Sequence, residues 1–247
     1  MKSAIRSINP HISVDCVIFG FSTSQLKVLL IEREYLDEQG NMAKDFKLPG
    51  DFISTMEDLD HAACRTLEEL TGLNDIFLKQ YAVFGNPERI SRPVDVNWLI
   101  STTGLPIKRV VTSAYFALIN ISDSKDEHAI KNNASWQDVQ DFPKLAFDHG
   151  ELIKRGLEHL RNALRNEPIG FELLPEKFTI RELQSLYEII LNRKLDNRNL
   201  RKKILKSKFL QQLEEKQVGV AHKPAFFYQF NKAVYEQHKK DHLGFNF

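Results

Sequence analysis

The sequence of 247 residues lacks the features that mark secreted and membrane-spanning proteins. It has two cysteines, Cys16 and Cys64, without metal-type spacing and without further cysteines to build a disulfide framework. Its apolar runs are only a few residues long, as in VLLI at 28–31, and the N-terminal MKSAIRSINPH has no apolar signal core. We therefore predict a cytoplasmic protein with no membrane partner.

The chain also lacks an excess of either charge, because 34 Lys and Arg residues oppose 33 Asp and Glu residues for a net charge of +1. This average conceals an asymmetry along the chain. Residues 166–247 carry 15 basic and 10 acidic residues, a balance of +5, which leaves 19 and 23, a balance of −4, for residues 1–165. We expect the two parts to have different partners.

The first part of the chain has the pattern of mixed α and β structure. Short apolar runs predict strands at 13–20, 26–33, 77–84 and 109–121. The first two strands are expected to form a hairpin. The polar segment 35–46 and the segment 86–108 are expected to be loops, and the length of the second is typical of functional loops. A helix is expected over 149–165, so the sequence predicts an α+β fold.

A short helix is also predicted within GDFISTMEDLDHAACRTLEELTGL at 50–73. Its apolar residues recur at helical spacing, and Asp58 stands where a side chain caps the first turn. Gly72 stands where a helix ends in the left-handed conformation. By itself, this pattern fits a surface helix with acidic residues facing water.

The same segment resembles the Nudix box, in which Gly, five residues, Glu and seven residues precede Arg-Glu-aliphatic-x-Glu-Glu-x-Gly-aliphatic. The preceding KLPGDF is also similar to the segment that leads into the box in that family. When Glu57 is set on the first Glu, the box positions include Asp51, Glu57, Arg65, Thr66, Glu69, Leu70 and Gly72. The resemblance implies a Nudix-like α/β/α sandwich domain over residues 1–165.

The resemblance fails at the positions that hold the metal in Nudix hydrolases. Thr66 and Leu70 replace two of the metal-binding Glu residues, and Asp51 replaces the first Gly. Mg²⁺ prefers several oxygen ligands in near-octahedral geometry, so the remaining Glu69 alone is a poor site. We therefore predict a degenerate box with no catalytic residue, no metal and no cofactor.

An enzyme is the competing hypothesis for this box. A hydrolase of nucleoside diphosphate derivatives would bind Mg²⁺ through Glu69, Glu57 and Glu68. However, Glu68 is displaced by roughly 100° around the helix from Glu69. We favour a structural role in which Arg65 pairs with Glu57 and holds the loop against the helix.

The second part of the chain predicts a winged helix-turn-helix domain over residues 166–247. NEPIGFELLPEK indicates a linker, and Thr179 and Glu182 have capping-box spacing at the start of a helix. Asp196 is expected to cap a second helix, NRNLRKKILKSK, with a buried stripe of Leu200, Ile204 and Leu205. FLQQL and PAFFYQF are expected to be the two strands of the wing.

The predicted second helix is cationic, since residues 193–208 carry eight Lys or Arg residues and one acidic residue. A solvated charged face explains this equally well from composition alone. The helix-turn-helix order favours double-stranded DNA, because the second helix of that motif enters the major groove. RNA is less favoured, because few aromatic residues accompany the basic ones. The predicted DNA-binding residues are Asn197, Arg198, Asn199, Arg201, Lys202, Lys203, Lys206, Lys208, His222 and Lys223.

The two parts together resemble the Nudix-related transcriptional regulators. The resemblance rests on VFGNPER, VVTSAYFALI, LAFDH, LLPEKFTIRELQSLYE and KLDNRNLRKK followed by HKPAFFYQF, in the family's order. It implies a repressor that binds palindromic operator DNA as a homodimer and is released by a small effector. Segment 90–107 departs from the compact form expected of the NAD-metabolism branch, which senses ADP-ribose. The arabinose-responsive branch is therefore the closer expectation.

The chemistry of the candidate residues bears on the effector. A diphosphate bound without a metal requires cations or the donors of a helix N-terminus, and Lys47, Arg33 and Arg89 are the candidates. A neutral pentose requires a few hydrogen bonds and an aromatic wall. The predicted effector-binding residues are Asp15, Lys47, Trp98, Tyr115 and Asp148. Loss of the metal site favours L-arabinose, with ADP-ribose as the alternative.

Overall fold

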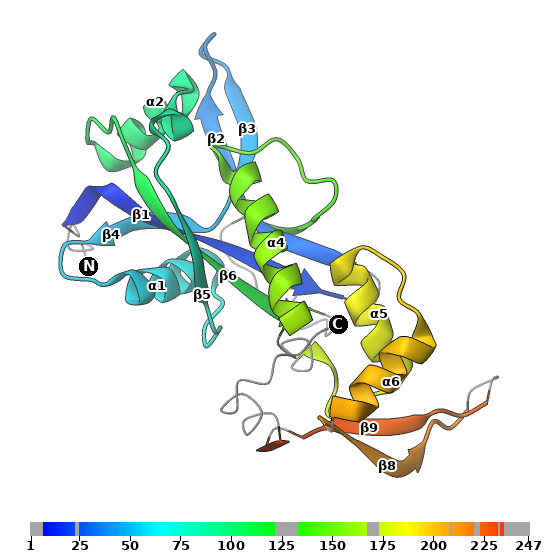
Figure 1. Cartoon of the computed structure of the whole chain (residues 1–247). Helices are drawn as coiled ribbons and strands as arrows, with labels where there is room; N and C mark the ends of the chain where they lie inside the picture. The colour runs from blue at the N-terminus through cyan, green and yellow to red at the C-terminus, as the bar shows by residue number, and fades with distance from the viewer. Residues whose placement is uncertain are drawn as a thin grey trace. The chain divides into compact units, whose positions relative to one another are not determined.

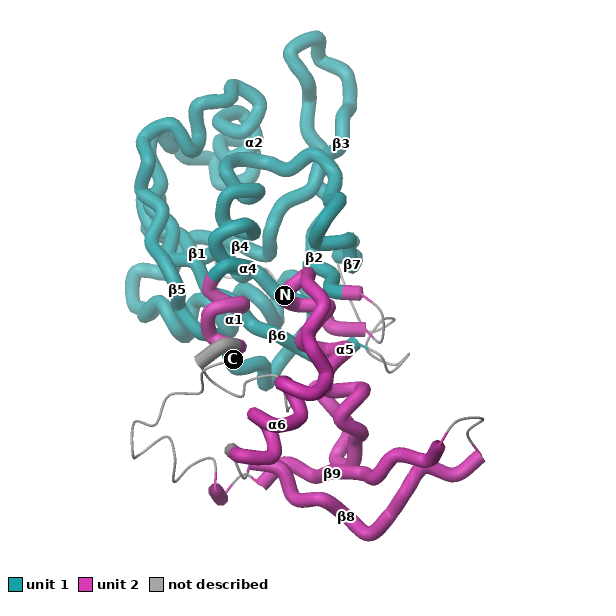
Figure 2. Tube along the Cα trace, turned by 45° about the vertical axis from the view of Figure 1, so that its right-hand side comes forward, with its two compact units in different colours: residues 1–20, 26–158 teal, residues 21–25, 159–247 magenta. Residues whose placement is uncertain are grey.

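The structure is a computed structural model that describes residues 7–22, 25–121, 133–166, 173–207, 209–219, 223–231 and 233–234. It divides into two compact units, which Figure 2 distinguishes by colour. Unit 1 comprises residues 1–20 and 26–158, and unit 2 comprises residues 21–25 and 159–247. The division falls within one helix, and the predicted domain boundary between residues 165 and 166 stays a prediction.

Unit 1 is built around one β-sheet. Among the described residues, seven strands pair in the order β3-β2-β1-β6-β5, with β4 paired to β1 and β7 paired to β2. The strands are β1 (Ile8–Phe21), β2 (Leu26–Leu36), β3 (Met42–Lys47), β4 (Gly50–Ser54), β5 (Lys79–Phe84), β6 (Val111–Asn120) and β7 (Ala134–Asp138). The predicted hairpin of the first two runs is present as β1 and β2, which are neighbours in the sheet.

Two helices cover opposite faces of this sheet, α1 (Leu59–Thr71) and α4 (His149–Asn166). Ala63 and Leu67 of α1 pack in one core cluster with Cys16 of β1. A Cβ at Gly156 of α4 would lie 3.5 Å from a methyl group of Val17, the next residue of β1. Successive strand residues point to opposite faces, so α1 and α4 flank the sheet and the predicted sandwich is confirmed. Figure 1 shows α4 lying across the sheet.

The predicted loop at 35–46 is wrong, because most of it belongs to a β-hairpin. β2 extends to Leu36 and β3 begins at Met42, with Leu36 and Met42 opposite each other. Figure 1 shows this hairpin projecting beside α2. Its exposed face carries a cross-strand ion pair between Lys44 and Glu32 at 2.7 Å. β3 is at the edge of the sheet, and its exposed face carries polar residues. Its composition therefore resembles that of a loop.

The predicted loop at 86–108 is also wrong, because it contains the 3₁₀ helix η1 (Pro87–Ile90) and the helix α2 (Pro93–Thr103). Pro93 fixes the backbone at the first turn of α2, where the missing N–H costs no hydrogen bond. Gly104 ends the helix in the left-handed conformation, with φ of 70°. The turn formers that suggested a loop are therefore the two ends of a helix.

Unit 2 contains α5 (Ile180–Leu191), α6 (Asn197–Ser207), β8 (Leu210–Lys216) and β9 (Phe226–Phe230). The predicted capping box is confirmed, because Thr179 and Glu182 satisfy each other's backbone donors at the start of α5. Asp196 caps α6 by accepting a hydrogen bond from the N–H of Asn199 at 2.8 Å. β8 and β9 pair antiparallel as the wing. The predicted winged helix-turn-helix fold is confirmed.

The turn between α5 and α6 is held by one acidic side chain. Glu188 accepts hydrogen bonds from the backbone N–H of Leu195 at 2.8 Å, from Gln184 at 2.9 Å and from Lys194 at 3.2 Å. These donors hold the pKa of the Glu188 carboxyl below its usual value. Glu188 thereby fixes the connection from which α6 starts.

Among the described helices, none has the length and apolar character that a membrane crossing requires.

Candidate effector pocket and DNA-binding helix

A pocket of about 330 Å³ opens in unit 1, within the size range of small-molecule sites. β1, β3, β4, η1, α2 and the start of α4 all contribute to its lining. Of the predicted effector residues, Asp15, Lys47 and Trp98 line it. Two positions of the Nudix box line it as well, Asp51 and Leu70. The pocket therefore lies directly beside the degenerate box.

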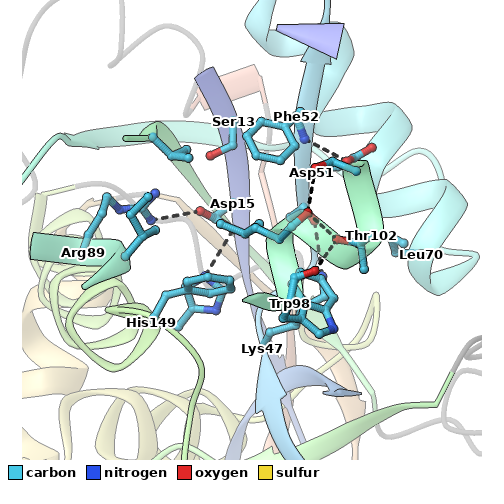
Figure 3. A pocket seen from close by; sticks show the side chains of 16 residues that line it. Ser13, Asp15, Lys47, Asp51, Phe52, Leu70, Arg89, Trp98, Thr102 and His149 are labelled. Atoms are coloured by element: carbon cyan, nitrogen blue, oxygen red, sulfur yellow. Dashed lines mark hydrogen bonds and ion pairs between the residues drawn. The ribbon is translucent and has the colours of Figure 1, made fainter. Parts of the chain in front are cut away.

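One end of the pocket is a buried charge network around Asp15 of β1. Figure 3 shows Asp15 between Arg89 and His149. Nη2 of Arg89 and Nε2 of His149 each lie 3.5 Å from a carboxylate oxygen of Asp15. Arg89 also donates to Asp148 at 3.0 and 3.2 Å. Asp148 thus reaches the site by orienting Arg89 and is not part of the pocket lining.

His149, which the sequence analysis missed, is held in one tautomer. Its Nδ1 accepts a hydrogen bond from the backbone N–H of Leu48 at 2.9 Å, so the proton of the neutral ring is on Nε2. Burial and, to a lesser extent, the positive charge of Arg89 lower the pKa of His149 to about 3. The ring therefore faces Asp15 as a neutral donor. The only sequence signal for it was its place in the LAFDH segment.

Lys47 stands at the end of β3 with its ammonium group beside the pocket. Its Nζ donates to two backbone oxygens, those of Gly50 at 3.3 Å and Leu48 at 3.4 Å. Among the described residues, no carboxylate oxygen lies within the 4.0 Å of an ion pair. Burial lowers the pKa of this ammonium group, which the more distant charges of Asp15 and Asp51 partly oppose. Lys47 is thus a desolvated cation whose direct contacts are neutral.

Part of the pocket lining is aromatic. Trp98 of α2 makes an edge-to-face contact with Phe147 at 6.2 Å between ring centroids, and the ammonium of Lys47 lies 5.8 Å from the Trp98 ring. Phe147 has a positive φ of 53°, an unusual conformation for a bulky residue. Its backbone N–H donates to Asp95 at 3.2 Å, which ties it to α2. Sequence reasoning missed Phe147 because nothing in the sequence marks a positive φ at Phe.

Besides Asp148, two candidate effector residues from the sequence, Tyr115 and Arg33, are not brought to the pocket lining. The ring of Tyr115 is buried in the core beside α1, and its hydroxyl donates to Asp60 at 2.6 Å. Arg33 is buried in ion pairs with Asp45 at 2.6 Å and Asp95 at 2.8 Å. Tyr115 is therefore a core residue. Arg33 packs its guanidinium group against the rings of Trp98 and Phe147 and is not part of the pocket lining.

The framework of the box is assembled around Arg65. All five N–H donors of its guanidinium group are used, and the predicted pair with Glu57 is confirmed at 2.7 and 3.0 Å. The other donors bind Asp51 at 3.1 Å, Glu69 at 3.0 Å and the backbone oxygen of Phe52 at 3.2 Å. Arg65 thus pairs with three carboxylates, and it fixes the segment 51–57, the end of β4 and the turn after it, against α1.

The positions that would complete a metal site offer no carboxylate. Thr66 is fully buried, and Leu70 presents an aliphatic side chain to the pocket. Glu69 remains, but it lies 3.0 Å from the guanidinium group of Arg65. Within the described ranges, no group of three or more His, Cys, Asp or Glu residues is arranged to hold a metal ion. This donor set does not fit the octahedral oxygen shell that Mg²⁺ requires.

The candidate DNA-binding surface is the outer face of α6. Leu200 and Ile204 are buried, whereas Leu205 is 41% exposed, so the predicted third member of the buried stripe is wrong. Leu205 lies about 140° around the helix from Leu200. The exposed residues of α6 include Asn197, Arg198, Asn199, Arg201, Lys202, Lys203 and Lys206. Lys223 is exposed beside β9, and Lys208 and His222 lie outside the described residues.

Comparison with known proteins agrees with this architecture. Residues 170–230 match the NrtR DNA-binding winged helix domain. The ADPR responsive transcriptional repressor NtrR of Acinetobacter baylyi is 31% identical over 232 residues, which cover 92% of this chain and 85% of that protein. The chain belongs to the NrtR-like regulator family. Its members combine a Nudix-like domain with a winged helix, as predicted from the sequence.

Solved structures of NrtR-like proteins extend the match over both domains. The crystal structure of Shewanella oneidensis NrtR is 27% identical with a TM-score of 0.67, covering 91% of this chain and 95% of that one. Its complex with a 27mer DNA is 26% identical with a TM-score of 0.66 and the same coverage.

A further relative by sequence, an ADP-ribose pyrophosphatase of Methanocaldococcus jannaschii, is 28% identical over 149 residues, 60% of this chain and 73% of that enzyme. These relatives do not support the predicted arabinose branch.

Proposed function

We propose that this chain is a transcriptional repressor that binds operator DNA through α6 and the wing and is released by ADP-ribose. ADP-ribose was the alternative effector in the sequence analysis, and it replaces L-arabinose here. The relative from Acinetobacter baylyi, which carries both functions in its name, supports the proposal. We further propose that the protein acts in the cytoplasm as a homodimer on a palindromic operator, since the two-fold symmetry of a dimer matches paired half-sites.

The observation that carries the proposed effector class is the position of Lys47. A half-buried ammonium group whose hydrogen-bond partners are the backbone oxygens of Gly50 and Leu48 is costly, and a bound anion would offset that cost. A neutral pentose offers no such compensation. Trp98 beside Lys47 supplies an aromatic surface for a base or a sugar. A nucleoside diphosphate sugar therefore fits this pocket better than a free pentose does.

The DNA-binding half of the proposal rests on the exposed cationic face of α6. We propose that Arg198 and Asn199, at the start of the helix, contact base edges. The other basic residues of α6, with Lys223 beside the wing, would contact phosphates. The structure of the Shewanella oneidensis protein complexed with a 27mer DNA supports a DNA-binding role for this fold.

The test is a DNA mobility-shift titration with the gene's own upstream region and full-length protein. We expect a specific complex that ADP-ribose dissociates, whereas L-arabinose and AMP leave it intact. Release by L-arabinose alone would reject the proposed effector, and failure to bind any upstream duplex would reject the repressor.

A pyrophosphatase is the second candidate, because Glu57 and Glu69 persist and one relative is an ADP-ribose pyrophosphatase. Incubation of the protein with ADP-ribose and Mg²⁺, followed by separation of AMP and ribose 5-phosphate, distinguishes the two. We expect no turnover above a protein-free control. Metal-dependent turnover that disappears in Glu69→Gln would identify an enzyme.

A further inference from the structure

We infer that the pocket binds the diphosphate of its effector without a divalent cation and that the ammonium group of Lys47 supplies the positive charge instead. This inference rests on the proposed function and specifies how its site recognises the ligand. Three observations support it: the box carboxylates pair with Arg65, the hydrogen-bond partners of Lys47 are neutral, and Arg89 is already paired with carboxylates.

The box carboxylates are already committed to the protein itself. Asp51, Glu57 and Glu69 all lie within 3.1 Å of the guanidinium group of Arg65, whose five donors are fully used. Recruiting these carboxylates to a metal ion would break the bonds that hold the segment 51–57 against α1. The side chain of Arg65 is only 18% exposed, so water would replace those bonds poorly. The box therefore has a structural use for the groups that a metal would need.

Leu70 separates the box from the ligand space. It lines the pocket together with Asp51, and it occupies a position that carries a carboxylate in the Nudix box pattern. An aliphatic side chain offers no electrons to a hard cation. A metal-bridged diphosphate would therefore find no ligand at Leu70, and the carboxylate of Asp51 beside it is already paired with Arg65 at 3.1 Å.

Lys47 is the group that is placed to replace the ion. Its strand β3 ends at the pocket, and its Nζ is held by the backbone oxygens of Gly50 and Leu48, between the Asp51 side and the Trp98 wall. Neutral oxygens orient the ammonium group and leave its charge uncompensated at short range. The third N–H donor of Lys47 has no protein acceptor among the described residues and is available to a phosphate oxygen.

The charge balance explains why Lys47 is preferred over Arg89. Arg89 also lines the pocket, but it already donates to Asp148 at 3.0 Å and lies 3.5 Å from Asp15. Two carboxylates around one guanidinium leave that end of the pocket negative, which favours sugar hydroxyls over phosphates. The diphosphate therefore belongs at Lys47, and a ribose fits beside Asp15 and His149.

The experiment measures the affinity of full-length protein for ADP-ribose by isothermal titration calorimetry, in MgCl₂ and in EDTA. We expect the same Kd in both. Lys47→Met should weaken binding by about tenfold or more in both, because a charge-assisted hydrogen bond in a desolvated site is lost. Lys44→Met is the matched control, since Lys44 is on the same strand with an exposed side chain that pairs with Glu32. It should bind as wild type does.

Each outcome separates the inference from the proposed function. Binding that disappears in EDTA and returns with Mg²⁺ would overturn the inference and leave the sensor intact. Wild-type affinity in Lys47→Met would overturn it as well, provided that this variant still unfolds cooperatively and binds the operator duplex. If neither condition gives ADP-ribose binding to the wild type, both the inference and the proposed effector are rejected.

Discussion

The Nδ1 atom of His149 lies 2.9 Å from the backbone nitrogen of Leu48, although 101 residues separate the two in the sequence. This hydrogen bond joins the start of α4 to the segment between β3 and β4. It also requires Nδ1 to be unprotonated, because a protonated Nδ1 has no lone pair to accept with. Protonation of His149 would therefore remove the contact that aligns two walls of the pocket.

His149 should make unit 1 sensitive to acid. Its pKa is lowered from 6.5 to about 3, so between these values the unfolded chain binds a proton that the folded protein does not. The contribution of His149 to the free energy of unfolding is therefore fully present above pH 6.5 and is lost as the pH decreases towards about 3. One pKa unit corresponds to about 1.4 kcal/mol, so protonation of this group alone lowers the free energy of unfolding by several kcal/mol across this pH range. Urea unfolding of His149→Gln across this range should show a flatter pH dependence.

The control for that measurement is His61→Gln on the exposed face of α1. Asp58 raises the pKa of His61 by a direct hydrogen bond, so its contribution to stability is present at low pH and is lost as the pH rises through the folded value. The two variants should change the pH profile with opposite sign. Identical profiles for wild type and His149→Gln would contradict the assigned burial of a neutral imidazole.

The parts of this fold that were predictable from sequence depend on residues close together in the chain. The capping box of Thr179 and Glu182 spans three residues, and the pair of Arg65 and Glu57 spans eight. Both belong to local motifs with fixed spacing. The contact of Arg89 with Asp148 spans 59 residues and depends on how the sheet brings η1 to α4. No spacing rule encodes such a contact.

The wrong predictions have a similar cause. Polar residues between 35 and 46 suggested a loop, because the pairing of Leu36 with Met42 is visible only in three dimensions. Tyr115 was expected to contact the effector, whereas its ring is buried and its hydroxyl donates to Asp60, a partner 55 residues away in the sequence. The candidate pocket was therefore identified in part, with Asp15, Lys47 and Trp98 in its lining and His149 and Phe147 missed.

Gly50 should be required for the pocket. A Cβ at this position would lie 1.9 Å from Oδ1 of Asp15, so Gly50→Ala must displace either β4 or the Asp15 side chain. We expect a loss of about 1–3 kcal/mol, as for overpacking of a core, together with weaker effector binding. Gly85→Ala is the control, since its nearest contact would be 3.6 Å from Val111. Thermal unfolding and ADP-ribose titration of both variants test this; equal effects would reject the steric account.

The Arg65 cluster should stabilise unit 1 without serving catalysis. Glu57→Gln weakens a charge-assisted pair whose side chains are 18% and 14% exposed, and we expect a loss of about 2 kcal/mol. The exposed pair of Lys44 and Glu32 is the comparison, for which Glu32→Gln should cost less than about 1 kcal/mol. Denaturant unfolding measures both. A smaller effect at Glu57 than at Glu32 would show that the cluster is not structural.

Lys47→Met should stabilise the protein in the absence of ligand, although it weakens effector binding. The wild-type ammonium group is desolvated, and burial lowers its pKa from 10.5, so the unfolded chain holds this proton more tightly than the folded protein. The folded-state cost of the charge is therefore present at neutral pH and is relieved as the pH rises through the lowered pKa. A higher unfolding temperature for Lys47→Met, with a smaller gain on adding ADP-ribose, is the expected pair of results. A destabilised variant would indicate that Lys47 serves packing instead.

The winged helix unit should lose DNA binding without loss of effector binding when its exposed arginines are removed. Arg198 and Arg201 are exposed on α6 and contribute to none of the buried contacts that hold the helix, which are made by Leu200 and Ile204. We expect Arg198→Ala with Arg201→Ala to weaken operator binding by about a hundredfold or more, since the base contact proposed for Arg198 is worth about 1–3 kcal/mol and the phosphate contact proposed for Arg201 is lost as well. The slope of affinity against salt should also decrease, because fewer counterions are released. Arg181→Ala, an exposed position on α5, is the matched control and should retain operator binding. If ADP-ribose affinity falls together with operator affinity in the double variant, the two activities do not reside in separate parts of the chain.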